Sequence, residues 1–180
     1  MQAARPVLVN RAPVLTLWAT VVAERLGYPP ETALTLGRFV AGSSARAKAR
    51  RLGMVEETEE TTERRRKRRE AQGGLETVRL LGREIPVVRA ADGRLRAAED
   101  GKPASSRSVA GYLARAFGDR QDEVRAAMEE LAASMPREEL NRTGFQLYEH
   151  FRPSVPEGVK GWGAKAELRL DRIRWAAGYP

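Results

Sequence analysis

The sequence predicts a mostly helical α+β fold, and three observations support this prediction. Most of the chain places apolar residues three and four positions apart, which is typical of amphipathic helices. Between about 75 and 97 the pattern changes to short apolar runs separated by turn residues, which indicates a β-hairpin region. A highly charged stretch separates the N-terminal helical pattern from the β-hairpin pattern. We therefore expect an N-terminal helical unit (1–55), a charged connector (56–74), and a β-hairpin with a C-terminal helical bundle (75–180).

The composition sets limits on what the chain can be. Its 180 residues are 42% hydrophobic, which is enough to bury a core. There is no cysteine, so disulfides, thiolate metal sites and cysteine nucleophiles are excluded. The apolar run at 14–23 lacks a basic start and a cleavage motif, and it is too short to span a bilayer. We expect a cytoplasmic protein that does not enter a membrane.

The first helix is expected to begin at Pro13 and to run to Leu26. Its polar residues Thr16, Thr20 and Glu24 recur every four positions, and nearly all others are apolar. This pattern predicts a helix that exposes a thin polar stripe to water and is buried on its other sides. Such a helix needs more cover than two short neighbours supply, so we also consider a homo-oligomer formed through it.

Two further helices are expected before the connector. Pro30 is placed to start a second helix, and Gly42 is placed to end it. Ser43 or Ser44 is then expected to cap a third helix that runs to Leu52.

Residues 19–38 resemble a helix-turn-helix, with Ala23 at the helix crossing and Gly27 in the turn. The start of the would-be recognition helix offers Pro29, Pro30 and Glu31, which are not residues that read base edges. We therefore favour a helical hairpin used for packing, and insertion into a DNA groove remains the alternative.

The segment after the connector is expected to form two or three short strands around a Gly82-Arg83 turn. Pro86 indicates an edge strand because proline cannot donate to a ladder. The loop 99–103 is expected to close this region.

Three helices with one apolar face each are expected next, packed as antiparallel neighbours. Ser105 or Ser106 caps the first, Asp119 caps the second, and Pro136 opens the third. Gly144 in the apolar face of the third predicts a close helix crossing.

The C-terminal tail gives a weaker pattern. Residues 166–170 fit a helix and a strand equally well, and 170–177 favour a helix. Trp18 and Trp175 are expected in the core.

A segment that we call the basic belt, residues 38–69, dominates the electrostatics. It holds eleven Lys or Arg against five Glu, so it carries six of the eight net positive charges of the chain. Clustered cations attract polyanions. The candidate nucleic-acid-binding residues are Arg46, Lys48, Arg50, Arg51, Arg64, Arg65, Arg66, Lys67, Arg68 and Arg69.

Within the belt, 56–69 places acidic residues first and basic residues last. It has no apolar face, so it is not core. Two interpretations stay open: a solvated helix or linker that ends at Gly73-Gly74, and an arginine-rich arm that orders on phosphates.

A second candidate anion site is the glycine-rich segment 158–165, where Lys160, Trp162 and Lys165 combine cations with a stacking surface. The alternative is a turn held by a buried Trp162, which we favour. An enzyme that acts on a phosphorylated substrate at this loop is a further, weaker hypothesis.

The other candidate groups of residues do not indicate a catalytic or metal site. His150 is the only histidine and fits a helix-end cation better than a metal ligand. Asp92, Asp100 and Lys102 faintly echo a metal-dependent nuclease, but Asp-Gly is a common turn pair, and we favour the turn. No cofactor or metal is expected, and an enzyme is not favoured.

The opening VLVNRAPVLTLWATVVAERLGYPPETALTLGRFVAG resembles the start of an uncharacterised group of bacterial proteins, and GWGAK does so more weakly. The resemblance implies a bacterial, cytoplasmic origin and carries no activity. From the charge pattern we expect a non-enzymatic protein that binds DNA or RNA through phosphate contacts. The alternative is a protein-interaction or oligomerisation module with a solvated linker.

Overall fold

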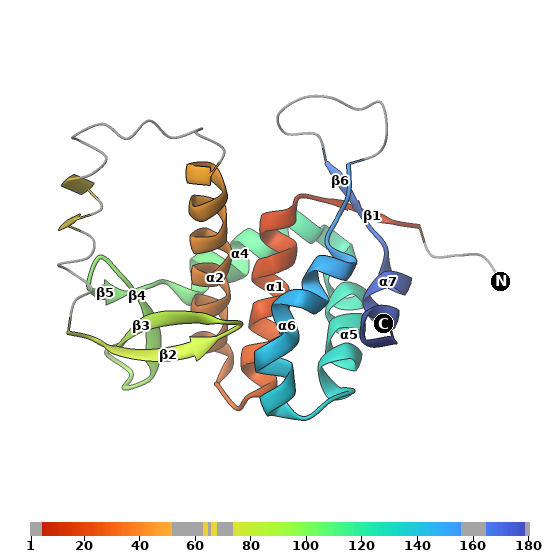
Figure 1. The fold of residues 1–180 in the computed structure, drawn as a ribbon. Coiled ribbons are helices and arrows are strands. Elements are labelled where there is room, and N and C mark those ends of the chain that lie inside the picture. Colours follow the sequence, from red (N-terminus) through yellow and green to blue (C-terminus); the bar gives the residue numbers. More distant parts are fainter. Residues whose placement is uncertain (1–4, 52–62, 65, 68–73, 156–164, 179–180) are drawn as a thin grey trace.

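The computed structural model describes residues 5–51, 63, 64, 66, 67, 74–155 and 165–178, and it confirms a mostly helical α+β fold (Figure 1). The helices are α1 (Arg11–Arg25), α2 (Pro30–Arg51), α4 (Ser106–Phe117), α5 (Gln121–Ala133), α6 (Arg137–Phe151) and α7 (Leu170–Trp175). The strands are β1 (Val7–Val9), β2 (Glu76–Leu80), β3 (Arg83–Arg89), β4 (Leu95–Glu99), β5 (Lys102–Pro103) and β6 (Ala166–Leu168). No helix in the described ranges is both long and apolar enough to cross a membrane.

Helix α1 is the centre of the fold. Every residue from Pro13 to Ala23 is buried, and α2, α4, α5 and α6 surround the helix (Figure 1). The Trp18 indole Nε1 donates to the Gly144 carbonyl oxygen at 2.9 Å, and its ring meets Phe151 edge-on. The predicted burial of the first helix and of Trp18 is confirmed, although the helix begins two residues before Pro13. The chain itself therefore covers this helix, and the homo-oligomer considered for it stays a prediction.

We expected the polar stripe of α1 to be exposed, but its residues Thr16 and Thr20 are buried because they form the contact with α2. Thr16 and Thr20 are fully buried, and a Cβ atom on Gly37 of α2 would lie 2.3 Å from Thr20 Oγ1. Their hydroxyls donate to carbonyl oxygens one turn earlier, those of Ala12 and Thr16, at 2.8 and 2.7 Å. These bonds satisfy the hydroxyls without water, so the stripe can be buried.

The turn between α1 and α2 is the one that the sequence indicates. Gly27 has a φ of 108°, which favours glycine over any other residue. The backbone N–H of Tyr28 donates to Ala23 O and that of Gly27 to Glu24 O, which is a Schellman motif. The predicted helical hairpin is therefore confirmed.

Helix α2 then runs without interruption to Arg51, so the predictions that Gly42 ends it and that a third helix starts at Ser43 or Ser44 are wrong. A glycine inside a helix costs about 1 kcal/mol relative to alanine, which a long alanine-containing helix tolerates. The Ser43 hydroxyl donates to Val40 O within the helix and caps nothing.

Strands β2, β3, β4 and β5 form an antiparallel sheet in that order. The first turn is Leu81-Gly82 rather than Gly82-Arg83, and both residues have positive φ, as a type I′ hairpin loop requires. Because β3 lies between β2 and β4, the prediction that Pro86 marks an edge strand is wrong. Proline is tolerated there because the pairing of β3 with β4 begins one residue later, at Val87.

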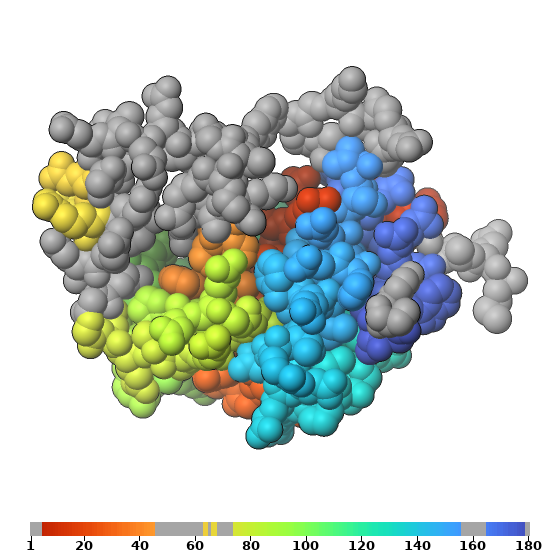
Figure 2. All heavy atoms as spheres, viewed as in Figure 1, coloured from red at the N-terminus to blue at the C-terminus, as the bar shows by residue number. Residues whose placement is uncertain are grey.

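The hairpin tip attaches the sheet to α6. Leu81 is buried, and a Cβ atom on Gly144 would lie 2.3 Å from Leu81 Cδ2. Asn141 Oδ1 accepts from the Leu81 N–H at 2.9 Å, and its Nδ2 donates to Arg79 O. Gly144 thus permits a close approach, but the partner of the helix is the β2–β3 hairpin, seen against α6 in Figure 2.

The C-terminal helices follow most of the predicted capping signals. Ser105 Oγ accepts from the Ser108 N–H at 3.1 Å at the start of α4, and α6 starts directly after Pro136. Asp119 caps no helix, because it lies within the short 3-10 helix Gly118–Arg120. These helices share one hydrophobic core with α1 and α2, and the three-part domain division stays a prediction.

The two ends of the chain meet in a small sheet. Strand β1 pairs with β6 in antiparallel fashion, so residues 166–168 are strand, and the helix expected from residue 170 is confirmed as α7. Trp175 is 63% exposed, so the prediction that it is core is wrong. In the short helix α7, Leu170 and Ile173 take the inward positions and leave Trp175 outside.

Candidate nucleic-acid interface

The first basic cluster of the belt lies at the end of α2. Ala41 is the last residue of α2 that is buried among those whose side chains the structure describes, and the helix continues for ten residues to Arg51, or about 15 Å at 1.5 Å per residue. Figure 1 shows this end extending beyond the sheet. The structure describes the backbone in this part of α2, and four candidate residues belong to it: Arg46, Lys48, Arg50 and Arg51.

The second basic cluster is described in part. Arg64, Arg66 and Lys67 are helical and exposed. Arg66 lies 3.9 Å from Glu63, and both side chains are more than half exposed, so this ion pair contributes little. Lys165, just before β6, is exposed as well. The remaining candidates lie outside the described residues: Arg65, Arg68, Arg69, Lys160 and Trp162.

The rest of the molecule is close to neutral. Removing the eleven cations and five acids of the belt from totals of 32 and 24 leaves 21 and 19. Many of these charges form ion pairs in the described part of the chain: Arg94–Glu31, Arg96–Asp92, Arg120–Glu123, Arg125–Glu24 and Arg174–Glu130. The unbalanced positive charge therefore belongs to the belt.

Two of these carboxylates are held in their ionised form. The pKa of Glu31 is lowered by its own backbone N–H and by Arg94. The pKa of Asp92 is lowered by the backbone N–H of Arg94 and by Arg96. The Arg94–Glu31 pair joins the N-terminal end of α2 to the sheet, and the Arg96–Asp92 pair stabilises the turn between β3 and β4. These arginines therefore have structural roles.

The residues considered for catalysis form no metal site in the part of the chain that the structure describes. Asp100 and Gly101 both have positive φ and form the two-residue turn between β4 and β5, as the turn interpretation expects. His150 lies exposed in the last turn of α6.

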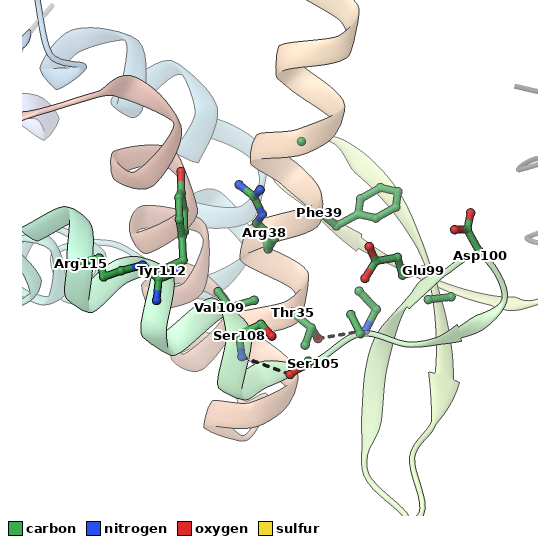
Figure 3. A pocket seen from close by; sticks show the side chains of 14 residues that line it. Thr35, Arg38, Phe39, Glu99, Asp100, Ser105, Ser108, Val109, Tyr112 and Arg115 are labelled. Atoms are coloured by element: carbon green, nitrogen blue, oxygen red, sulfur yellow. Dashed lines mark hydrogen bonds between the residues drawn. The ribbon is translucent and has the colours of Figure 1, made fainter. Parts of the chain in front are cut away.

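A cleft that the sequence did not reveal lies beside the first turns of the belt (Figure 3). Its volume is about 560 Å³, and its walls come from α2, α4 and the β4–β5 hairpin. The Arg38 guanidinium lies over the Tyr112 ring, 4.6 Å from its centroid. The lining includes Thr35, Arg38, Phe39 and Gly42 of α2, Ala97 to Asp100 and Ala104 of the hairpin, and Ser105, Ser108, Tyr112 and Arg115 of α4 and its cap.

Buried threonines fix the geometry of this cleft. Thr35 Oγ1 accepts from the Ala97 N–H at 2.9 Å (Figure 3). The same hydroxyl donates to Thr32 O at 2.8 Å. The Thr32 hydroxyl donates to Leu95 O. These bonds tie β4 to α2, so the wall formed by the hairpin is held against the helix that carries the basic residues.

Comparison with known proteins assigns nothing further, since no family model, no curated protein and no solved structure matches the chain. The resemblance of the opening residues to bacterial proteins therefore stays an expectation.

Proposed function

We propose that the protein binds DNA or RNA without catalysis and does so mainly through phosphate contacts from the basic belt. One observation carries the proposal: α2 continues past the core as a helix that holds Arg46, Lys48, Arg50 and Arg51, while the rest of the molecule is nearly neutral. A basic helix that continues from a folded core attracts a polyanion.

The packing of α2 lowers the free-energy cost of binding. Its first half is packed against α1, so the helix is stable before any ligand is present. Binding then does not have to supply the entropy cost of ordering this part of the backbone, which lowers the free-energy cost of association. The basic residues of 64–69 add further positive charge to the same belt of the sequence.

The test is a salt titration of binding to duplex and single-stranded oligonucleotides by fluorescence anisotropy. We expect the logarithm of the binding constant to fall linearly with the logarithm of salt concentration. Replacing Arg64, Arg65, Arg66 and Lys67 by Gln should reduce the slope by about one for each contact that is lost.

A matched variant controls for the change in net charge. Arg137, Arg142, Arg152 and Arg172 are exposed residues outside the belt, and their replacement by Gln removes the same number of charges. We expect this variant to keep the slope of the unmodified protein. Absence of binding at low salt, or equal loss in the two variants, contradicts the proposal.

The alternative, an interaction module that uses the apolar first helix, has less support. The surface that motivated it is covered by α2, α4, α5 and α6 within one chain. Light scattering tests this alternative, which requires a species larger than the monomer.

A further inference from the structure

The cleft beside α2 has the size and lining of a small binding pocket. Its volume of about 560 Å³ lies within the usual range for ligand pockets. Gly42, Ala97, Ala98 and Ala104 line it with small side chains, which leaves room for a planar group. The same helix that forms one wall continues into the basic residues of the belt.

The cationic end of the cleft is arranged in advance. Arg38 is held over Tyr112 by a cation–π contact, and Arg115 lies one turn further along α4. Both arginines are exposed, and neither forms an ion pair with a carboxylate in the described residues. A phosphate group suits this end, because guanidinium groups donate paired hydrogen bonds to phosphate oxygens.

The opposite end of the cleft has a different chemistry. In Figure 3, Phe39 leaves α2 on the side of Glu99 and Asp100, away from the contact between Arg38 and Tyr112. Phe39 is half-buried and offers a ring on which a base can stack. Glu99 can accept hydrogen bonds from exocyclic amino groups, and its charge disfavours a phosphate at this end.

From this polarity we infer that the cleft receives one unpaired nucleotide of a single-stranded nucleic acid. Its phosphate lies toward Arg38 and Arg115, and its base stacks on Phe39. The inference rests on the proposed function and deepens it, because a base that is paired and stacked within a duplex cannot enter the cleft without leaving its stack. The protein should therefore prefer single strands, whereas the belt alone has no such preference.

The test compares single-stranded and duplex oligonucleotides of about 12 nucleotides, within the site sizes of single-strand binders. A DNA arm and an RNA arm separate the two sources of the strand. Phe39→Leu and Arg38→Gln should each weaken single-strand binding about tenfold, as expected for loss of one stacked base or one phosphate contact. Duplex binding should change less than about twofold in Phe39→Leu, which keeps every belt cation. In Arg38→Gln it should weaken less than single-strand binding does, since ten of the eleven belt cations remain.

Two controls keep the result interpretable. Arg142→Gln removes one exposed charge on α6, outside the cleft, and should leave both affinities close to those of the unmodified protein. Gly42→Leu fills the cleft without changing any charge, so it should weaken single-strand binding alone. Circular dichroism and thermal melting verify that each variant is folded.

The outcomes separate the two ideas. If the unmodified protein binds neither form at low salt, the proposed function is wrong, and the inference fails with it. If it binds both forms and the cleft variants bind single strands as well as it does, the inference is wrong and the proposed function stands. Equal losses for single strands and duplexes in Arg38→Gln also overturn the inference, because they indicate a general charge effect.

Discussion

The two halves of α2 have different surroundings although they belong to one continuous helix. From Pro30 to Ala41 the helix contributes several residues to the core and packs on α1, and from Gly42 onward none of its described residues is buried. The first half fixes the position of the helix, and the second half extends from that fixed position. One helix therefore serves as core in one half and carries the first basic cluster in the other.

A glycine in each half shows the contrast at the level of single atoms. A Cβ atom on Gly37 would lie 2.3 Å from Thr20 Oγ1 and 2.5 Å from the Thr16 carbonyl oxygen. Gly42 is half-buried and lines the open cleft. The contact between the helices requires the first glycine, whereas the second lies at the edge of a cleft.

The largest effect is expected from Gly37→Ala. The added methyl group collides with a backbone atom of α1, so the two helices must separate along their main contact. We expect a loss of about 3 kcal/mol in the free energy of unfolding, at the upper end of the range for overpacked cores. Urea unfolding followed by circular dichroism measures it.

The double variant Gly37→Ala/Thr20→Ala identifies the atom responsible. It removes Thr20 Oγ1 but leaves the Thr16 carbonyl oxygen in place, so we expect only partial recovery relative to Thr20→Ala alone. Full recovery would show that the side chain, and not the backbone, sets the distance between α1 and α2.

The sequence predicts much of this fold because many of its signals are local. The turn at Gly27, the cap at Ser105 and the hairpin at Asp100-Gly101 each depend on a few neighbouring residues, and all three are present. Periodicity likewise indicates which helices have a buried face. The errors concern residues whose role is set by distant partners. Thr16 and Thr20 look solvent-facing until Gly37 is placed against them.

The candidate site likewise has one part that the sequence reveals and one part that it does not. Composition alone reveals the belt, since a count of charges needs no structure. The cleft cannot be read from the sequence, because Arg38, Ala98 and Tyr112 come from three elements that only tertiary packing brings together. Pairing of charges is equally non-local: Glu24 and Arg125 meet across the core helices at 2.8 Å.

A smaller loss is expected from Thr35→Val, which tests how the first half of α2 holds the sheet. The substitution keeps the shape of the side chain but leaves the buried Ala97 N–H without its acceptor. We expect a loss of about 2 kcal/mol in the free energy of unfolding. Ser43→Ala in the second half removes a hydroxyl that bonds only within the helix, at 3.2 Å, and should cost less than about 0.5 kcal/mol. Similar losses in the two variants would contradict the contrast between the halves.

The smallest effect, and the only gain in stability, is expected from Gly42→Ala. The position lies in the middle of a continuous helix, where alanine lowers the backbone entropy of the unfolded chain and so favours folding. A gain of about 0.5–1 kcal/mol is expected in the same unfolding measurement that detects the loss in Gly37→Ala. The two variants introduce the same methyl group into the same helix, so their difference isolates the surroundings from helix propensity. A loss of stability in Gly42→Ala would mean that the second half of α2 is also closely packed. The cleft would then have less space beside Gly42 than its lining residues indicate.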